Sequence, residues 1–371
     1  MSLDNYFAVD GFCRLRKRND GLMERLRVGI LGATGAVGQQ FVRLLSGHPW
    51  FEITALAASE RSAGKSYADA ANWMGSEPIP EEIGSMMVQA CETGLECDFV
   101  FSGLDASVAG EIEANFARAG YPVISNARNF RMGADVPLLI PEVNPGHTAL
   151  IDRQKWSSGG FIVTNPNCST VGLVCALKPL ADAFGLETVQ VTTMQALSGA
   201  GYPGVSSLDI LGNVVPYIGG EEEKLETEPL KLMGTLTDGV VQPLQTVISA
   251  QCNRVAVLDG HLEAVSLRFT EKATPEEAIA ALREYPNPIA EFGLPTSPDL
   301  FIKVFDDPRF PQPRRQAGLG SGMTVSVGRV RHCPVQDLRM VVLSHNTIRG
   351  AAGGAILNAE LLVHQGYLKP R

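Results

Sequence analysis

The feature that most constrains the fold is the alternation of short apolar runs with helical patterns through the first half of the chain. The apolar runs have the length and continuity of buried strands. They occupy residues 26–31, 52–58, 98–101, 122–125 and 138–140. Residues 36–46 and 108–119, between these runs, carry apolar side chains at helical spacing. This alternation predicts an α/β fold with a parallel, doubly wound Rossmann-type sheet.

The pattern changes after about residue 161, where longer runs alternate polar and apolar residues. These runs predict strands of a mixed sheet in an α+β catalytic domain. The expected strands are 187–195, 262–269, 324–332 and 338–344, and the expected helices are 170–184, 205–214, 275–284 and 351–365. We expect an N-terminal extension (1–26), a cofactor domain (27–163 with 345–371) and a catalytic and dimerisation domain (164–344). Residues 61–96 are less regular and are interpreted as a surface excursion.

A glycine-rich loop follows the first predicted strand in the sequence VGILGATGAVG. Glycines at 32, 35 and 38 let backbone N–H groups approach a pyrophosphate closely, and the following helix start favours negative charge. The spacing differs from the common G-x-G-x-x-G, and a plain tight turn is the alternative. Its position between strand and helix favours dinucleotide binding. The predicted contacts are Gly32, Thr34, Gly35, Ala36 and Val37.

The end of the second predicted strand bears on the choice of nicotinamide cofactor. An acidic residue there usually binds the ribose of NAD. Here the segment reads ASERS, and Ser59, Arg61 and Ser62 suit the 2′-phosphate of NADP. Glu60 could instead serve a ribose, and the segment could simply be a solvated loop. NADP is the favoured cofactor.

Cys168 stands where the sequence TNPNCSTV passes from an extended segment into an apolar helical run. A cysteine at a helix N-terminus is expected to have a lowered pKa and to populate thiolate. Thiolate is the nucleophile in thioester chemistry. The alternative, a small buried apolar side chain, is assigned to the other six cysteines.

Composition excludes several classes of protein. The 371 residues are 45% hydrophobic with a net charge of -9, which favours neither a nucleic acid nor an anionic membrane as partner. No apolar run approaches the roughly 20 residues that span a bilayer. The seven cysteines form no C-x-x-C pair, so we expect free thiols, a cytoplasmic location and no metal site.

Five motifs together resemble the aspartate-semialdehyde dehydrogenase family. They are GATGAVG, NPNCST, MQALSGAG, GEEEK and NRVAVLDGH, in the family's order from about residue 26 onward. SERSAGK and the IGGEEEK segment are similar to the archaeal and fungal branch. The resemblance implies a fold like that of glyceraldehyde-3-phosphate dehydrogenase and a homodimer or homotetramer.

The resemblance also implies a reaction. NADPH would reduce L-4-aspartyl phosphate to L-aspartate 4-semialdehyde, with release of phosphate, through a thioester on Cys168. This reaction serves the biosynthesis of lysine, threonine, methionine and isoleucine. In the family His261 would protonate the developing oxyanion, and a pKa near neutrality suits a histidine to acid–base work. Gln195 would orient the thioester or the substrate carbonyl.

The remaining site residues hold substrate and cofactor in the resembling family. Arg254 would grip the α-carboxylate with its planar guanidinium. Glu221, three residues before Lys224 and on the same helix face, would bind the ammonium, although Glu222 and Glu223 leave the choice open. The phosphate would contact Lys224, Arg131 and Asn167, and the cofactor would also contact Ser198, Gly199 and Asn346. At Asn346 the sequence SHNTIRGAAGGA departs from the family's usual N-D-x-x-x-GAAGG.

Three other functions fit part of the sequence. A sister acyl reductase, acting on malonyl-CoA or N-acetylglutamyl phosphate, would share the chemistry. A cysteine hydrolase or acyltransferase would leave the glycine loop unexplained. A silent binding protein would leave Cys168, Gln195, Arg254 and His261 unexplained.

Overall fold

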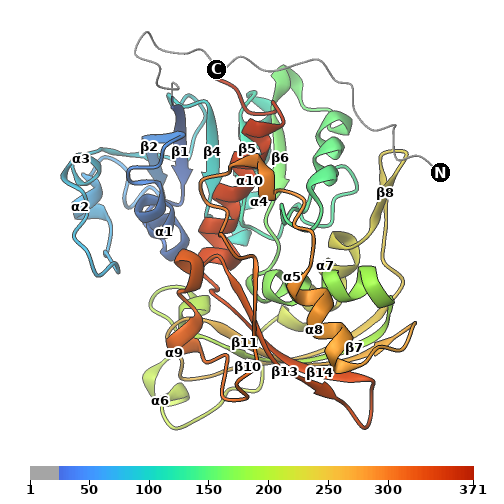
Figure 1. The fold of residues 1–371 in the computed structure, drawn as a ribbon. Coiled ribbons are helices and arrows are strands. Elements are labelled where there is room, and N and C mark those ends of the chain that lie inside the picture. Colours follow the sequence, from blue (N-terminus) through green and yellow to red (C-terminus); the bar gives the residue numbers. More distant parts are fainter. Residues whose placement is uncertain (1–24) are drawn as a thin grey trace.

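The computed structural model describes residues 25–371, so the predicted extension lies almost wholly outside the described residues, as does Cys13. Figure 1 shows two halves stacked one above the other, with a parallel sheet in the upper half and a mixed sheet in the lower half. The chain runs through the upper half, then the lower half, and returns to the upper half in its last helix.

The upper sheet has six parallel strands in the order β3-β2-β1-β4-β5-β6. Its elements are β1 (Leu26–Leu31), α1 (Ala36–Leu45), β2 (Phe51–Ala58), α2 (Tyr67–Ala70), α3 (Glu81–Gly84), β3 (Val88–Ala90), β4 (Phe99–Ser102), α4 (Ala106–Arg118), β5 (Pro122–Ser125), η1 (Pro145–Arg153), η2 (Ser157–Gly159) and β6 (Phe161–Thr164). The Rossmann-type sheet predicted from the strand–helix alternation is confirmed.

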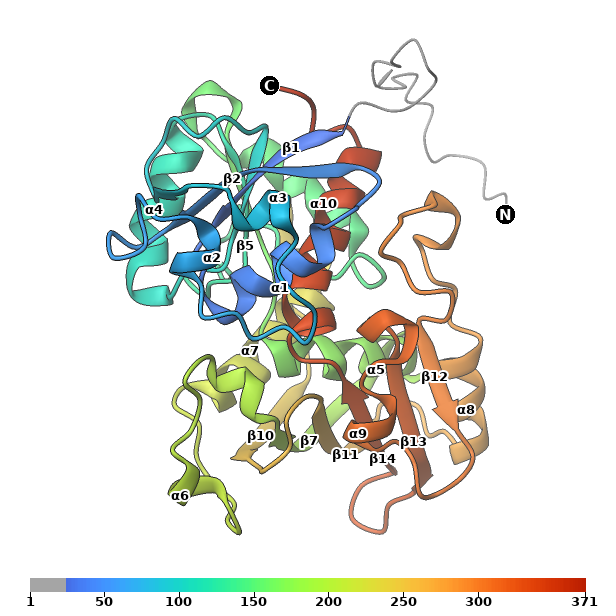
Figure 2. The ribbon, with the colours of Figure 1, turned by 90° about the vertical axis from the view of Figure 1, so that its left-hand side faces the viewer.

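Helices cover both faces of this sheet because its strands are apolar on both sides. α1 and α10 (Gly353–His364) pack with Val28, Ile30 and Phe101 into one core. α4 packs on the opposite face, where Phe116 meets Val100. The C-terminal helix therefore completes the core of the first sheet, as Figure 2 also shows. The exact division into domains stays a prediction.

The lower sheet is mixed, in the order β10-β7-β11-β14-β13-β12, with only β10–β7 and β12–β13 parallel. Its half contains α5 (Cys168–Phe184), β7 (Leu186–Gln195), η3 (Leu197–Ala200), α6 (Ser207–Ile210), α7 (Glu221–Leu232), β8 (Thr235–Thr237), β9 (Val240–Gln242), β10 (Val247–Arg254), β11 (His261–Phe269), α8 (Pro275–Arg283), η4 (Ala290–Phe292), β12 (Ile302–Phe305), α9 (Pro313–Gln316), η5 (Leu319–Gly322), β13 (Val325–His332), β14 (Leu338–Ser344) and the π-helix η6 (Ile348–Ala352). In Figure 1, α5, α7 and α8 lie between this sheet and the upper half.

Three expectations about local structure were wrong. Residues 138–140 form a single bridge, Leu138 to Thr164, in place of a strand. The helix expected at 205–214 shortens to α6, because only Ile210 of its leucine and isoleucine side chains is buried, whereas Leu208 is 90% exposed. The segment 61–96 is more than an excursion, since its strand β3 forms the sheet edge. No helix within residues 25–371 is long and apolar enough to cross a bilayer.

Candidate active site

Cys168 is the first residue of α5, and Asn167 caps that helix. The Asn167 Oδ1 accepts hydrogen bonds from the backbone N–H groups of Ser169, at 3.0 Å, and Thr170, at 3.3 Å. These groups carry the partial positive charge that favours an anion at a helix start. The cap therefore competes with the sulfur for the N–H groups that were expected to stabilise a thiolate.

The ends of three neighbouring strands place the two other predicted catalytic side chains and the predicted substrate-binding Arg254. His261 starts β11, and its Nε2 lies 3.3 Å from the Cys168 Sγ. The register between β11 and β7 puts His261 beside Gln195, the last residue of β7. Arg254 ends β10 and pairs directly with Gln195. One row across the sheet thus carries Arg254, Gln195 and His261, and α5 packs against this face with Cys168 at its end.

Gln195 and Arg254 are both buried and already hydrogen bonded. The Gln195 Nε2 lies 3.4 Å from the hydroxyl of Thr193 and 3.4 Å from the Glu221 Oε2. One guanidinium nitrogen of Arg254 donates to the Ala196 carbonyl at 2.7 Å. The guanidinium has five N–H groups, so it can still bind a carboxylate with the others.

The structure distinguishes the three consecutive glutamates at the start of α7. Glu221 is buried, accepts from Asn167 at 2.8 Å and pairs with Lys224 at 2.5 Å. Glu222 accepts from an N–H group of β10, and Glu223 is exposed. The geometry therefore favours Glu221, which the motif spacing had selected, as the glutamate of the site.

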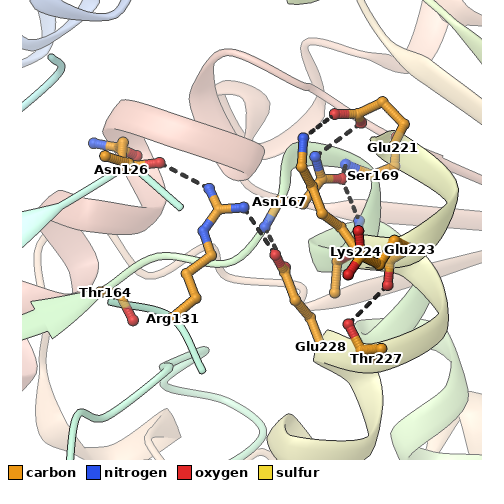
Figure 3. A network of polar contacts seen from close by, with 12 residues as sticks. Asn126, Arg131, Thr164, Asn167, Ser169, Glu221, Glu223, Lys224, Thr227 and Glu228 are labelled. Carbon is orange, nitrogen blue, oxygen red and sulfur yellow. Dashed lines mark hydrogen bonds and ion pairs between the residues drawn. The ribbon is translucent and has the colours of Figure 1, made fainter. Parts of the chain in front are cut away.

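Arg131 lies beside this group but is held by an acid that the sequence analysis did not single out. Its guanidinium donates to Glu228 at 2.9 Å and to the Asn126 carbonyl at 2.7 Å. The other oxygen of Glu228 accepts from the backbone N–H of Asn167 at 2.6 Å. Figure 3 shows Glu228 between Arg131 and the Asn167 turn. Arg131 is thus tied to the turn that carries the nucleophile.

The pKa of Cys168 runs opposite to the sequence expectation. Desolvation by the surrounding protein raises the pKa of this thiol to about 12, and the negative charge of Glu221 adds to the rise. Arg131, Arg254 and Lys224 act in the opposite direction without overcoming it. The expectation failed because the Asn167 cap occupies the first-turn N–H groups, and because burial outweighs the charge of the helix terminus.

His261 and Glu221 are displaced from their ordinary titration ranges. Burial lowers the pKa of His261 to about 3, and the positive charge of Arg254 lowers it further. For Glu221, desolvation acts to raise the pKa, but Lys224, Asn167 and Gln195 together hold the pKa below its usual value. At neutral pH the site therefore holds a neutral imidazole and a carboxylate.

The loop between β1 and α1 fits the pyrophosphate of a dinucleotide. Gly35 caps α1 without a side-chain hydrogen bond, and the first turn contains no acidic residue. The first N–H groups of α1, which begins with Ala36 and Val37, are therefore available to an anion. Gly32 has a φ of 77° and a Cβ there would lie 2.9 Å from the Gly103 carbonyl. Thr34, between them, is half-buried.

The other predicted cofactor residues lie on two loops. Ser59 and Arg61 are exposed just beyond β2, in a turn closed by the N–H of Ser62 donating to the Ser59 carbonyl at 2.8 Å. On the lower half, the Asn346 amide donates to the Ser198 hydroxyl at 2.8 Å. The Asn346 side-chain oxygen also accepts a hydrogen bond from the backbone N–H of Gly260, at 2.9 Å.

Gly199 allows the loop that carries Ser198 to lie close to Arg254 and His261. A Cβ at Gly199 would lie 3.0 Å from both Arg254 and the His261 ring. Any larger residue here would require the guanidinium or the imidazole ring to shift. The loop of Ser198 and Gly199 therefore lies directly over the residues that surround Cys168.

Two contributors to the site were missed in the sequence. Glu228 follows Glu221 by seven residues, a spacing that places both on one face of α7, so helical periodicity could have found it. The backbone N–H of Ala196, which donates to the His261 Nδ1 at 3.0 Å, has no sequence signal.

The fold and the site define a class: a Rossmann-type oxidoreductase in which a cysteine and a histidine meet above a mixed sheet, beside the cofactor loop. Comparison with known proteins narrows this class. Residues 27–151 match the family described as semialdehyde dehydrogenase, NAD binding domain, and residues 177–349 match semialdehyde dehydrogenase, dimerisation domain.

Related proteins match this chain over nearly its whole length. The chain is 50% identical to an aspartate-semialdehyde dehydrogenase from Archaeoglobus fulgidus, over 92% of this chain and 99% of the relative. It is 51% identical to one from Candida albicans, over 91% and 97%. A crystal structure of the Candida albicans enzyme with NADP aligns with a TM-score of 0.85 at 49% identity, over 92% and 99%. The Vibrio cholerae enzyme II, complexed with ASA, gives 0.73 at 30% identity, over 92% and 98%.

The chain belongs to the aspartate-semialdehyde dehydrogenase family, as the five motifs had indicated.

Proposed function

We propose that this enzyme reduces L-4-aspartyl phosphate to L-aspartate 4-semialdehyde with NADPH, through a thioester on Cys168, in the biosynthesis of lysine, threonine, methionine and isoleucine. The observation that carries the proposal is the 3.3 Å contact between the Cys168 Sγ and the His261 Nε2, within a full-length family match. The relatives from Archaeoglobus fulgidus, Candida albicans and Schizosaccharomyces pombe are all named for this activity.

NADPH would supply the hydride, and the residues that would hold it lie on three loops. The uncapped start of α1 fits its pyrophosphate. Arg61, which is exposed next to Ser59 and Ser62, fits its 2′-phosphate. The loop at Ser198 and Asn346 fits its nicotinamide half. The related structure from Candida albicans was solved with NADP, which supports this choice.

The substrate would be gripped at both ends beside Cys168. Arg254 retains N–H groups for the α-carboxylate, and Glu221 carries the negative charge that an ammonium needs. The phosphate would lie near Arg131, Lys224 and Asn167. Lys224 and Arg131 are paired with Glu221 and Glu228 here. We therefore expect the substrate to exchange some of these contacts for its own.

In the first step the sulfur of Cys168 bonds to the acyl carbon, and the bond from that carbon to the phosphate oxygen breaks. The guanidinium of Arg131 and the ammonium of Lys224 offset the charge on the departing phosphate. In the second step the thioester carbon accepts a hydride. Gln195 orients the carbonyl, and the C–S bond then breaks to release the aldehyde. Covalent catalysis thus divides one hard reaction into two easier ones.

The test is the reverse reaction, the phosphate-dependent reduction of NADP by purified protein with L-aspartate semialdehyde. Cys168→Ala should lose all turnover, whereas Cys333→Ala, which changes a buried cysteine just after the end of β13, should keep it. Turnover that persists in Cys168→Ala would overturn the proposal. If neither cofactor is reduced, malonyl-CoA with NADPH is the next substrate to try.

We also propose that the enzyme works as a homodimer or homotetramer. The family description of residues 177–349 as a dimerisation domain supports self-association. So does an apolar surface on the loop around α6, where Tyr202, Leu208, Leu211 and Tyr217 are each at least 65% exposed. Light scattering after size exclusion separates the two assemblies, and a monomer at micromolar concentration would refute both.

A further inference from the structure

Lys231 is a buried cation whose hydrogen-bond donors are all in use. It lies on α7, three residues after Glu228, and only 7% of its surface is exposed. Its ammonium donates to three backbone carbonyls of one loop, those of Arg131 at 2.7 Å, Gly133 at 2.7 Å and Val136 at 2.8 Å. An ammonium has three N–H groups, so none is left for another partner. Lys231 therefore has no donor with which to bind a substrate itself.

The side chain of Lys231 is still charged at neutral pH. Burial lowers its pKa to about 8, while the negative charges of Asp135 and Glu228 oppose this decrease. His147 on η1 lies near enough to be affected: burial, and after it the charge of Lys231, lowers the pKa of that ring to about 4. At pH 7 Lys231 is therefore an ammonium with three donors, beside two carboxylates and a neutral imidazole.

The carbonyls that accept from Lys231 belong to the loop that carries Arg131. Turns close this loop, because the N–H of Gly133 donates to the Phe130 carbonyl at 3.0 Å and the N–H of Val136 donates to the Gly133 carbonyl at 3.2 Å. A backbone carbonyl that is buried without a partner costs free energy. The ammonium gives three carbonyls one common partner, and so it ties the loop of residues 131–136 to α7. We call this contact the Lys231 clamp.

Arg131 is held by its side chain as well as by its backbone, and one of its donors is unused. Its guanidinium donates to Glu228 at 2.9 Å and to the Asn126 carbonyl at 2.7 Å, as Figure 3 shows. Its buried Nε has no hydrogen-bond partner among the described residues. A buried donor without a partner is costly, and the oxygen of an anion would supply the missing acceptor. Glu228 and Lys231 thus fix the position of a guanidinium that has an N–H group left for a ligand.

We propose that Lys231 is a positioning residue for the phosphate: its clamp on the loop of residues 131–136 fixes the place at which Arg131 presents its unused N–H to the phosphate oxygens. This inference rests on the proposed function, in which Arg131 binds the phosphate. Lys231 contacts neither substrate nor cofactor and acts only through Arg131. Loosening the loop should therefore weaken binding of the phosphate and leave binding of the semialdehyde and of NADP unchanged, because other residues make those contacts.

The main test is the KM of each substrate in the phosphate-dependent oxidation of L-aspartate semialdehyde at pH 7. Lys231→Met has nearly the same length and no donor, so it should raise KM for phosphate about tenfold and leave KM for the semialdehyde and for NADP within twofold. Lys178→Met is the matched control, because it removes a lysine that pairs with Asp182 on α5, and it should leave all three values within twofold. An unchanged KM for phosphate in Lys231→Met, or a similar rise in all three KM values, would overturn the inference.

A second variant covers the case in which methionine leaves three carbonyls without a partner and the protein does not fold. Lys231→Gln is shorter and uncharged but keeps two N–H donors. It should raise KM for phosphate about threefold and leave the other two KM values unchanged. The inference fails if Lys231→Gln folds and binds phosphate as well as the natural enzyme does.

Hydrogen exchange measures the clamp without any substrate. In Lys231→Gln the backbone amides of Gly133 and Val136 should exchange about tenfold faster than in the natural enzyme, while the amides of β11 should exchange at the same rate in both. Unchanged exchange in the loop would overturn the inference whatever happens to turnover. If the loop exchanges faster but the natural enzyme shows no phosphate-dependent turnover, the proposed function fails, and the role of Lys231 in phosphate binding fails with it while the clamp remains.

Discussion

Glu263→Gln should be more stable than the natural enzyme, and this difference in the free energy of unfolding should grow as the pH rises. Glu263 lies on β11, two residues after His261 and on the same face of the sheet. It is 1% exposed, and neither carboxyl oxygen has a hydrogen-bond partner among the described residues. Desolvation raises its pKa well above the ordinary value, so the folded protein holds a neutral acid there.

The sign and size of the effect follow from proton linkage. Above pH of about 4.3 the unfolded chain releases the Glu263 proton while the folded chain keeps it. The free energy of unfolding therefore falls by about 1.4 kcal/mol per pH unit until the pH reaches the folded pKa. This stability is fully present below the unfolded pKa and is lost as the pH rises. Glutamine has nearly the same shape and no proton to lose, so Glu263→Gln lacks this slope.

The assay compares urea unfolding of both proteins from pH 5 to 8. His261 and His147, whose pKa values burial lowers to about 3 and about 4, give slopes of the opposite sign below pH of about 6.5. Both proteins contain these histidines, so their slopes cancel in the difference. Glu276→Gln, on the exposed face of α8, is the matched control. Parallel curves for the natural enzyme and Glu263→Gln would refute the reasoning, because they would mean that Glu263 is ionised when folded.

Three further changes test the site. Glu228→Gln leaves the buried Arg131 without its acid and should destabilise the enzyme by about 3 kcal/mol in urea unfolding; a loss below 1 kcal/mol would mean that the pair is solvated. Gly350→Ala puts a Cβ 2.9 Å from the backbone of Cys168 and should lower kcat about 100-fold in steady-state assays, unless η6 can move aside. Arg61→Ala should raise KM for NADPH about tenfold and leave KM for NADH within twofold; equal changes would place the 2′-phosphate elsewhere.

The fold was predictable where one physical signal dominated. Short and mostly apolar runs such as 26–31 favour strands buried on both faces, and the alternation in 262–269 implies one polar and one apolar face. The prediction of a longer helix around α6 was wrong although it used the same kind of signal, the spacing of apolar residues. Its apolar spacing resembles that of an amphipathic helix, but Leu208 and Leu211 are exposed and have no core to pack against within residues 25–371.

The side chains of the site could be predicted from the sequence, but the hydrogen bonds that hold them could not. Cys168, Gln195, Arg254 and His261 come together as the motifs implied. Some of the contacts that hold these side chains involve the backbone, and one of them is the N–H of Ala196, which donates to the His261 ring. Every residue but proline offers such a group, so no sequence pattern distinguishes it.

The failure of the pKa expectation for Cys168 bears on how the nucleophile becomes reactive. A helix start would lower a thiol pKa if its N–H groups were free, but Asn167 takes two of them. The cations nearby are no more available, because Lys224 is paired with Glu221 and Arg131 with Glu228. The raised pKa therefore favours the thiol form of Cys168 before substrate binds.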